Sequence, residues 1–201
     1  MSKGRQINSV CVYCGSSDRV DGAYLAEAHK MGSAIARRGM RLIFGGGGTG
    51  LMGAVADAAL EGGAEVIGVI PDNFNTEQLA HDGLTELRVV DTMHVRKTMM
   101  ADMADAFVAL PGGFGTLEEL FEMLTWAQIG LHSKPVGILN AQGYFDSLLN
   151  LINHAQEEGF LYSEHTSLLL AETDPNRLLE ALEAYQRPEG LERWVNRQKE
   201  D

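Results

Sequence analysis

The sequence predicts an α/β protein built on a doubly wound parallel sheet of about seven strands, with helices on both faces. Two observations support this prediction. Short segments of the chain are almost continuously apolar, which is typical of parallel strands that are covered on both faces. Helical stretches lie between most of these segments, and strands that alternate with helices favour a doubly wound sheet.

The apolar segments are rich in β-branched and aliphatic residues, as strands are. In chain order, the predicted strands are SVCVYCG at 9–15, RLIFGG at 41–46, EVIGVIP at 65–71, ELRVVD at 86–91, AFVALPG at 106–112, PVGILN at 135–140 and SLLLAE at 167–172.

Helices are predicted between most of these strands and after the last one. The final helix has a well-defined start, because Asp174 is a good N-cap and Pro175 suits the first helical position. The predicted helices span residues 23–38, 51–61, 93–104, 117–130, 143–157 and 175–185.

The length of 201 residues suits one domain that spans residues 1–201, and no linker, repeat or low-complexity segment interrupts it. The charged segment RPEGLERWVNRQKED at 187–201 is expected to be a mobile tail. Within it, Leu191, Trp194 and Val195 could dock as one helical turn.

The chain is acidic, with a formal net charge of −12 and a pI of about 4.9. Such a field repels nucleic acid and anionic membranes, so neither is an expected partner. No segment approaches the roughly 20 apolar residues that span a bilayer. The N-terminus has no apolar stretch long enough for a signal peptide. We therefore expect a cytoplasmic location.

The cysteines, Cys11 and Cys14, have the C-x-x-C spacing of some redox and zinc sites. Zinc would need two more ligands, and neither an H-x-x-x-H motif nor a second C-x-x-C supplies them. A thioredoxin-type pair opens a helix, whereas SVCVYCG is a predicted strand in which positions three apart face opposite ways. We interpret both as small residues of a buried strand and expect no metal site.

In doubly wound sheets, ligands bind in the crevice beyond the carboxyl ends of the strands. The segments that follow the strands are therefore candidates for binding, and Ser16, Gly46 and Gly47 are expected among the contacts. These segments are Gly15–Ser17, Gly45–Gly53, Pro71–Asp72, Asp91–Lys97 and Pro111–Glu119.

The first glycine-rich loop has the G-x-G-x-x-G pattern of dinucleotide folds at Gly48, Gly50 and Gly53. A tight turn with close helix packing would explain the same glycines. A P-loop is excluded because no Gly-Lys-Ser/Thr follows. An NAD-dependent oxidoreductase is an alternative, with Asp72 near the place of the ribose-binding acid. However, the motif follows the second strand, and a second glycine loop fits one nucleotide monophosphate better.

The second loop, PGGFGTLEE, has a structural alternative, in which Thr116 is an N-cap and Glu119 completes a capping box. The run of glycines exceeds what a cap needs. Arg96 and Lys97 lie near the start of a preceding helix that should face the same crevice, where Arg96 could bind a phosphate. A solvated pair of cations is the alternative, although cations near a helix N-terminus oppose its dipole. The pattern favours an anionic ligand.

The segments CVYCGSS, GGGGTGLMG, MHVRKTMM and PGGFGTLEELFEMLTWAQIG resemble the Lonely Guy family of cytokinin riboside 5′-monophosphate phosphoribohydrolases, whose members are often labelled lysine decarboxylases. The resemblance runs from about residue 7 to residue 185. It implies a Rossmann-like fold, usually a homodimer, without metal or organic cofactor. It also implies hydrolysis of the N-glycosidic bond of a nucleoside 5′-monophosphate, either AMP or an N6-modified relative, to free base and ribose 5-phosphate.

By position, the resemblance implies that Arg96 and Glu119 are the catalytic pair. Many members have a substrate-contacting glutamate where this chain has Gln78, with Glu77 beside it, so that contact differs here. The other residues that match substrate contacts of the family are Lys97, Gly113, Phe114, Gly115, Thr116, Leu117, Glu118 and Thr125.

The lysine decarboxylase label has no support in the residues. Pyridoxal chemistry needs a Schiff-base lysine with an acidic partner for the ring nitrogen. Lys134 comes before a predicted strand and therefore lies at the edge of the sheet away from the crevice.

Cleavage of a ribosyl bond develops oxocarbenium character on the sugar, which a carboxylate can stabilise. Glu119 is the candidate, held ionised at a helix start and able to activate water, and Glu122 is the second choice. The phosphate is expected against the backbone of Gly113–Thr116, with Gly45–Gly50 opposite. A catalytically silent nucleotide sensor could use the same loops, although binding alone would not need a carboxylate beside an anionic ligand.

Overall fold

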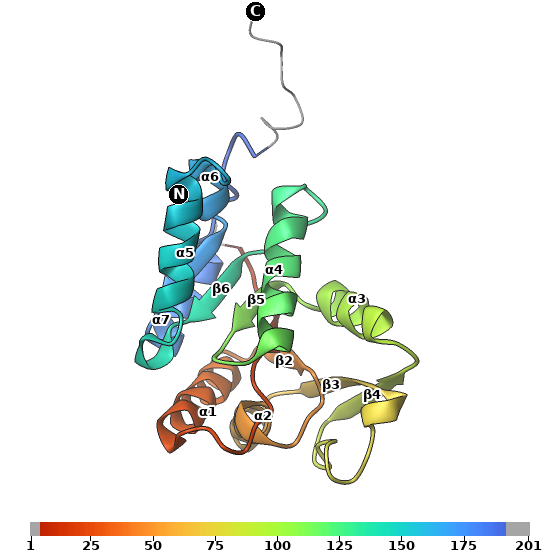
Figure 1. The fold of residues 1–201 in the computed structure, drawn as a ribbon. Coiled ribbons are helices and arrows are strands. Elements are labelled where there is room, and N and C mark those ends of the chain that lie inside the picture. The colour runs from red at the N-terminus through yellow and green to blue at the C-terminus, as the bar shows by residue number, and fades with distance from the viewer. Residues whose placement is uncertain (1–4, 192–201) are drawn as a thin grey trace, which may run out of the picture.

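The computed structural model describes residues 5–191 and contains a seven-stranded sheet in the order β4-β3-β2-β1-β5-β6-β7 (Figure 1). Every neighbouring pair is parallel. The predicted fold class, a doubly wound parallel sheet of about seven strands, is confirmed. The strands are β1 Ser9–Tyr13, β2 Arg41–Phe44, β3 Val66–Pro71, β4 Glu86–Val90, β5 Ala106–Ala109, β6 Val136–Leu139 and β7 Leu169–Glu172.

Helices cover both faces of the sheet, and two apolar clusters mark the two layers. Helices α1, α2 and α7 pack on one face, and α3 and α4 pack on the other, together with residues of α5. The helices are α1 Gly22–Arg37, α2 Gly50–Glu61, α3 Met93–Met103, α4 Phe114–Gln128, α5 Asp146–Glu157, α6 Ser163–Thr166 and α7 Pro175–Ala184, with 3-10 turns η1 at Asp72–Phe74 and η2 at Ala141–Gly143.

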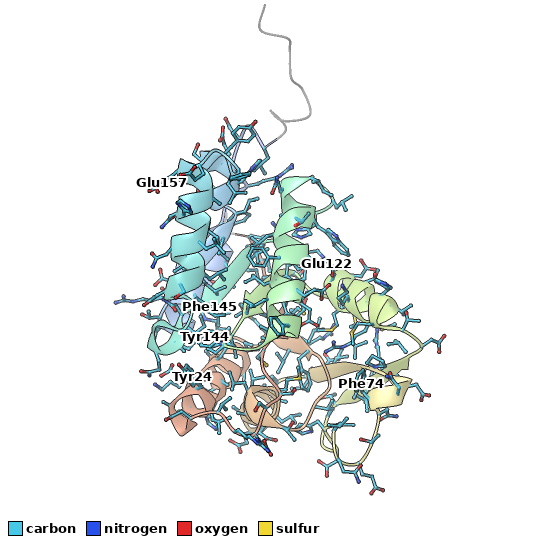
Figure 2. All side chains as sticks on the ribbon, in the orientation of Figure 1. Tyr24, Phe74, Glu122, Tyr144, Phe145 and Glu157 are labelled. Carbon is cyan, nitrogen blue, oxygen red and sulfur yellow. The ribbon has the colours of Figure 1, made fainter. Side chains whose placement is uncertain are left out.

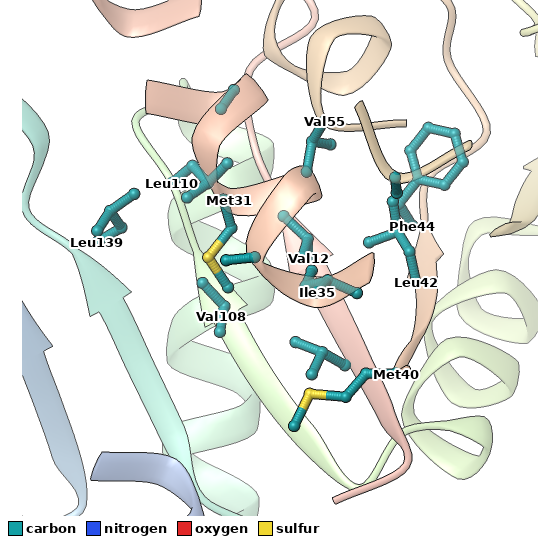
Figure 3. Packing of buried hydrophobic residues seen from close by; sticks show 14 of the residues in the cluster. Val12, Met31, Ile35, Met40, Leu42, Phe44, Val55, Val108, Leu110 and Leu139 are labelled. Atoms are coloured by element: carbon teal, nitrogen blue, oxygen red, sulfur yellow. The ribbon is translucent and has the colours of Figure 1, made fainter. Parts of the chain in front are cut away.

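Strand β1 shows how one segment serves both layers, because alternate side chains point to opposite faces. Val12 packs with Met31 and Ile35 of α1 in the first cluster, as Figure 3 shows. Cys11 belongs to the second cluster, whereas Cys14 belongs to the first. The prediction that the two cysteines face opposite ways is therefore confirmed, and both are free and buried.

The observed strands end earlier than predicted wherever glycines follow. Strand β1 ends at Tyr13 instead of residue 15, and β5 ends at Ala109 instead of residue 112. The residues beyond these ends leave the sheet to form loops at its carboxyl edge. The short helix α6 and the turns η1 and η2 were not predicted, because segments of three or four residues carry no helical periodicity.

The C-terminal segment 187–201 was expected to be a mobile tail in which Leu191, Trp194 and Val195 could dock as one helical turn. Leu191 is buried and belongs to an apolar cluster with Ala127 and Leu168. Trp194, Val195 and the rest of 192–201 lie outside the described residues. No helix within residues 5–191 is long and apolar enough to cross a membrane.

The strand order places a topological switch point between β1 and β5, because the chain turns from β1 toward β2 and returns from β4 to β5. The loops after these two strands are hydrogen bonded, since the N–H of Gly15 donates to the carbonyl of Pro111 at 3.0 Å. Ligands of doubly wound folds bind at such a point. The two glycine-rich segments flank it.

Candidate functional site

Arg96 is a buried polar side chain at the carboxyl edge of the sheet. It lies in the first turn of α3, after the N-cap Thr92, and is 8% exposed. Its Nε donates to the carbonyl of Val69 at the end of β3 at 3.0 Å. Its Nη1 lies 3.2 Å from Oε1 of Glu119 and 3.2 Å from Sδ of Met93.

The glycine at position 45 leaves the space that the Arg96 guanidinium occupies. A Cβ at Gly45 would lie 2.0 Å from Nη2 of Arg96, so any side chain at this position would force the guanidinium to move. The first glycine loop therefore provides the space in which the Arg96 guanidinium lies.

Glu119 of α4 faces Arg96 and is 6% exposed. Burial raises the pKa of Glu119 from 4.5 to about 7, while the charge of Arg96 opposes this rise. The expectation that its place at a helix start holds Glu119 ionised is therefore corrected: near pH 7 both protonation states are populated.

The capping-box interpretation of Thr116 and Glu119 is wrong. Helix α4 begins at Phe114, and its N-cap is Gly113, without a side-chain hydrogen bond. Thr116 lies inside the first turn and packs against Gly112, where a Cβ would meet its Oγ1 at 2.1 Å. Glu119 lies beyond the first turn, and its hydrogen-bond partner is Arg96.

Lys97 faces α4 and is 7% exposed. Its ammonium group contacts the carboxylate of Glu118 and lies 3.0 Å from Oε1 of Glu122, which Figure 2 labels on α4. Burial lowers the pKa of Lys97, but hydrogen bonds to Glu118 and Glu122 outweigh it and raise the pKa. The alternative of a solvated Arg96–Lys97 pair is wrong, because both side chains are buried and ion-paired.

The N-terminus of α4 is open to solvent, and Gly113, Phe114 and Gly115 are exposed. The first N–H groups of any α-helix lack intrahelical partners and can bind an anion. In α2, by contrast, the N–H groups of Leu51 and Met52 donate to the carbonyl of Gly15 at 2.9 and 3.3 Å. The start of α4 is therefore better suited to a phosphate than the start of α2.

The glycines of the G-x-G-x-x-G pattern have packing roles. Gly50 has a φ of +61°, and a Cβ there would lie 2.5 Å from the carbonyl oxygen of Ser17. A Cβ at Gly53 would lie 2.5 Å from the carbonyl oxygen of Gly48. Together with the occupied start of α2, this favours the tight-turn interpretation over a dinucleotide site. Asp72 is exposed in η1.

An apolar cavity of about 180 Å³ lies beside Arg96, at the carboxyl ends of β2 and β3. Phe74 is one of its exposed apolar residues and is labelled near β3 and β4 in Figure 2. The lining residues are Ser16, Gly45, Gly47, Thr49, Met52, Ile70, Pro71, Phe74, Leu79, Met93 and Arg96.

The structure brings Ser16, Gly47 and Arg96 together around this cavity, as expected for one site. Gly46 is buried, with a φ of +77°, and packs against Ile70 below the cavity. Gln78 is exposed beside Leu79 and is not among the lining residues.

Leu117 and Thr125, which were predicted as substrate contacts, lie on α4 and are not among the residues that line the cavity. Leu117 is half-buried and packs on the second apolar cluster. Thr125 is exposed, and its hydroxyl donates to the carbonyl of Phe121 on the same helix at 2.7 Å.

Sequence reasoning missed the apolar walls Met52, Phe74, Leu79 and Met93. Met93 is the first residue of the motif MHVRKTMM, two residues after Asp91. No sequence pattern predicts the contact between its sulfur and Arg96. Phe74 ends η1, and Leu79 lies between η1 and β4, in a stretch without strand or helix periodicity. The position of Leu79 next to Gln78 was the available signal.

Lys134 lies at the edge of the sheet opposite the crevice, as predicted from its place before β6. Its Nζ donates to the carbonyl of Ala101 at 2.7 Å and lies 5.9 Å from the centre of the Phe107 ring. Residues 5–191 contain no group of three or more His, Cys, Asp or Glu side chains arranged to hold a metal ion.

Together, the fold and the site define a Rossmann-like α/β protein with a buried arginine–glutamate pair next to an open helix N-terminus. The family model described as "Possible lysine decarboxylase" matches residues 52–182. The Arabidopsis thaliana cytokinin riboside 5′-monophosphate phosphoribohydrolase LOG4 is 46% identical over 88% of this chain and 82% of its own length. The rice enzyme LOG is 44% identical over 88% of this chain and 73% of its length. The chain therefore belongs to the family of cytokinin riboside 5′-monophosphate phosphoribohydrolases.

Solved structures support the same fold. The molybdenum cofactor carrier protein of Chlamydomonas reinhardtii superposes with a TM-score of 0.67, at 22% identity, over 88% of this chain and 96% of that chain. DNA processing protein A of Streptococcus pneumoniae superposes with a TM-score of 0.57, at 16% identity, over 88% of this chain and 62% of that chain. At such identities the likeness concerns the fold alone.

Proposed function

We propose that this protein hydrolyses the N-glycosidic bond of nucleoside 5′-monophosphates and releases the free base and ribose 5-phosphate. The substrates are AMP, N6-modified adenosine monophosphates of the cytokinin type, or both. Relatives that carry this activity in their names are 44–46% identical to most of the chain. The single observation that carries the proposal is the buried Arg96–Glu119 pair beside the cavity.

Glu119 is suited to act at the anomeric carbon. As the bond between C1′ and N9 breaks, positive charge develops on the ribose, and a nearby carboxylate stabilises it. A general base works best when its pKa lies near the operating pH, and that of Glu119 is raised to about 7. The ionised carboxylate takes a proton from the attacking water, which adds to C1′. The base leaves with the electron pair of the C1′–N9 bond and takes up a proton from solvent.

Arg96 orients Glu119 and offers positive charge to the substrate. Its Nε and Nη1 hold Val69 and Glu119, so that the guanidinium is fixed before the nucleotide arrives. Such preorganised charge acts without reorganisation during the reaction. Arg96 also lines the cavity, where it can offset negative charge on the phosphate or on the departing base.

The phosphate is proposed to bind at the start of α4, at the backbone of Gly113–Thr116. Exposed N–H groups and the helix dipole favour an anion at this place. Binding energy from the phosphate then positions C1′ beside Glu119, so a nucleoside without phosphate should react poorly.

The base is proposed to occupy the cavity, because apolar side chains form most of its wall. Met52, Ile70, Leu79 and Met93 would accept an adenine ring or an apolar N6 substituent. Ser16 and Gly47 lie at the same cavity and would contact the nucleotide.

A product assay tests the proposed function. The purified protein is mixed with AMP and, separately, with N6-isopentenyl-AMP, and the free base and ribose 5-phosphate are followed by chromatography. Release of base supports a phosphoribohydrolase, and the ratio of the rates identifies the preferred base. No release from either nucleotide, with binding still detected by calorimetry, would favour a catalytically silent sensor.

We propose that the reaction needs no metal or organic cofactor. Glu119 supplies the proton acceptor and Arg96 the positive charge that the proposed hydrolysis requires. Full activity after treatment with EDTA and dialysis would support this proposal, and restoration of lost activity by a divalent cation would contradict it. The cytoplasmic location likewise stays a prediction, which cell fractionation would test.

We propose a homodimer in which a second copy covers α4 and α5. Helix α5 has no buried residue, and Leu151 on it is 59% exposed. Phe121 of α4 and its C-cap Ile129 are 41% and 45% exposed, and Leu131 after α4 is 67% exposed. Apolar side chains concentrated on one side of a molecule mark an interaction surface. Both helices lie on the same face of the sheet (Figure 1).

A further inference from the structure

The segment 75–85 connects η1 to β4 without helix or strand and contributes Leu79 to the lining of the cavity. It is held mainly by its backbone. The N–H of Gly48 donates to the carbonyl of Leu79 at 2.8 Å, and the N–H of His81 donates to the carbonyl of Gly46 at 2.9 Å. Gly47 and Ala80 form an isolated antiparallel bridge. These contacts join the segment and the glycine loop into one hydrogen-bonded unit.

His81 is the side chain that fastens this unit to the body of the protein. Its imidazole is 9% exposed, although its neighbours from residue 75 to 79 are exposed. Nδ1 accepts a hydrogen bond from the N–H of Gly83 at 3.0 Å. The ring proton is then on Nε2, which lies 3.0 Å from Oδ1 of Asp57 on α2.

These contacts do not include the catalytic pair. Arg96 is held by Val69 and Glu119, which lie on β3 and α4. Leu79 and Gly47, however, both line the cavity. The carbonyl of Leu79 accepts the N–H of Gly48, and Gly47 lies between the bonded residues Gly46 and Gly48. Loosening His81 should therefore disturb the cavity wall while Arg96 and Glu119 keep their geometry.

We propose that His81 is a positioning residue, which, through Asp57, holds the 75–85 segment and the glycine loop against the bound nucleotide. This inference rests on the proposed function, because it assigns the cavity to the substrate. The expected effect is on substrate affinity. The loss of one such hydrogen bond should raise KM about fivefold to tenfold, with kcat within about twofold of wild type.

Three substitutions separate the two ring contacts. His81→Asn can keep an acceptor near Nδ1 for Gly83 but loses the bond to Asp57. His81→Gln can keep a donor near Nε2 for Asp57 but loses the acceptor for Gly83. Asp57→Ala removes the partner on α2 and should match His81→Asn. In a double-mutant cycle, His81→Asn and Asp57→Ala should be non-additive in KM, because both break one bond.

A matched control comes from a second histidine–carboxylate pair. His29 on α1 lies 3.4 Å from Glu61 on α2, and neither residue lines the cavity. His29→Ala should leave KM unchanged. KM and kcat for AMP and N6-isopentenyl-AMP, together with thermal unfolding, are measured for all variants.

Raised KM with preserved kcat in His81→Asn and Asp57→Ala, and not in His29→Ala, would support the proposal. Unchanged KM with a lowered melting temperature would overturn it, because His81 would then be structural only. A large loss of kcat at unchanged KM would also overturn it. If the wild type binds AMP without releasing base, the proposed function is wrong but the role of His81 can still be tested by calorimetric affinity for AMP. Equal affinity of the wild type and His81→Asn would then overturn the role of His81. A wild type that neither cleaves nor binds AMP overturns both.

Discussion

At the scale of single residues, burial decides the chemistry of the candidate site. Arg96 and Glu119 form an ion pair with side chains only 10% and 7% exposed. Removing one partner of a buried pair leaves the other charge without compensation. The identity of the pair could be predicted from MHVRKTMM and PGGFGTLEE. The raised pKa of Glu119 could not, because it depends on the layers that cover the carboxyl group.

Glu119→Gln should abolish turnover while the protein stays folded. The amide fills the same volume and can still accept a hydrogen bond from Arg96, but it cannot take a proton from water. Kinetics on AMP and thermal unfolding of the purified variant provide the measurement. A variant that keeps most of its activity would show that Glu119 has no catalytic role.

Arg96→Ala should lose both affinity and rate. The guanidinium is expected to contact the nucleotide and also holds Glu119 at 3.2 Å, so KM should rise and kcat should fall. Arg96→Lys is the informative companion, since a lysine keeps the charge but cannot bond Val69 and Glu119 with one planar group. Kinetics of Arg96→Ala that match the wild type would remove Arg96 from the site.

The pKa of Glu119 also predicts two pH dependences. As a base, Glu119 must be ionised, so kcat/KM should rise with pH through about 7. Because the folded-state pKa lies above the ordinary value of 4.5, the stability associated with the protonated carboxyl is present below pH 4.5 and lost as the pH rises through about 7. The loss amounts to about 3 kcal/mol relative to Glu119→Gln, in which this group does not titrate.

Urea unfolding of the wild type and of Glu119→Gln at about pH 4 and about pH 9 measures this difference. The free energy of unfolding of the wild type should fall relative to that of the variant on going to the higher pH. A difference between the two proteins that does not change with pH would contradict the raised pKa.

At the scale of elements, loops and helix starts depart most from the sequence prediction. The apolar runs correctly predicted the central residues of each strand, because a parallel strand buried on both faces has a continuous apolar pattern. Their ends shifted, since the glycines after β1 and β5 leave the sheet. Helix α4 began three residues earlier than predicted, at Phe114, because exposed Gly113 takes the N-cap place that Thr116 was expected to fill.

The 75–85 segment could not be placed from sequence for a different physical reason. Backbone hydrogen bonds to Gly46 and Gly48 hold it, and such bonds leave no hydrophobic period. The position of Leu79 in the cavity lining therefore could not be predicted from the sequence, because it depends on the conformation of the glycine loop. Gln78, which the resemblance suggested as a substrate contact, is exposed next to Leu79.

Gly45→Ala tests whether the glycine loop serves the arginine. The added Cβ would lie 2.0 Å from Nη2 of Arg96, so the guanidinium must move and the bond to Glu119 should be lost or weakened. Activity should fall by about tenfold or more, as expected for a displaced charged hydrogen bond. Gly22→Ala at the start of α1 is the control, since its Cβ would meet nothing within 4 Å. Equal activity of the two variants would contradict this role of Gly45.

At the scale of the whole molecule, the order of the strands creates the site. Alternating strands and helices predicted a doubly wound sheet, but several strand orders satisfy that pattern. At the switch point between β1 and β5, the loop at Gly15 is hydrogen bonded to the loop at Pro111. Helix α3 precedes β5 in the chain and places Arg96 next to Glu119 of α4. The sequence placed each of these residues after a strand, and only the strand order makes them neighbours.

The proposed homodimer yields a prediction at the same scale. Ile129, the C-cap of α4, and Val89 on the edge strand β4 are both 45% exposed, but only Ile129 belongs to the surface proposed for the second copy. Ile129→Lys would place an ammonium group in an apolar interface, and burying an unpaired charge is costly. It should shift the protein to monomers in analytical ultracentrifugation, whereas Val89→Lys should not.

The melting temperature provides an independent readout, because a dimer is stabilised by mass action and a monomer is not. The wild type and Val89→Lys should therefore melt at higher temperature as protein concentration rises, and Ile129→Lys should lose this dependence. If Val89→Lys dissociates the protein and Ile129→Lys does not, the second copy covers the β4 edge instead. A wild type that sediments as a monomer at all concentrations would contradict the dimer, and the exposed side chains of α4 and α5 would then need another partner.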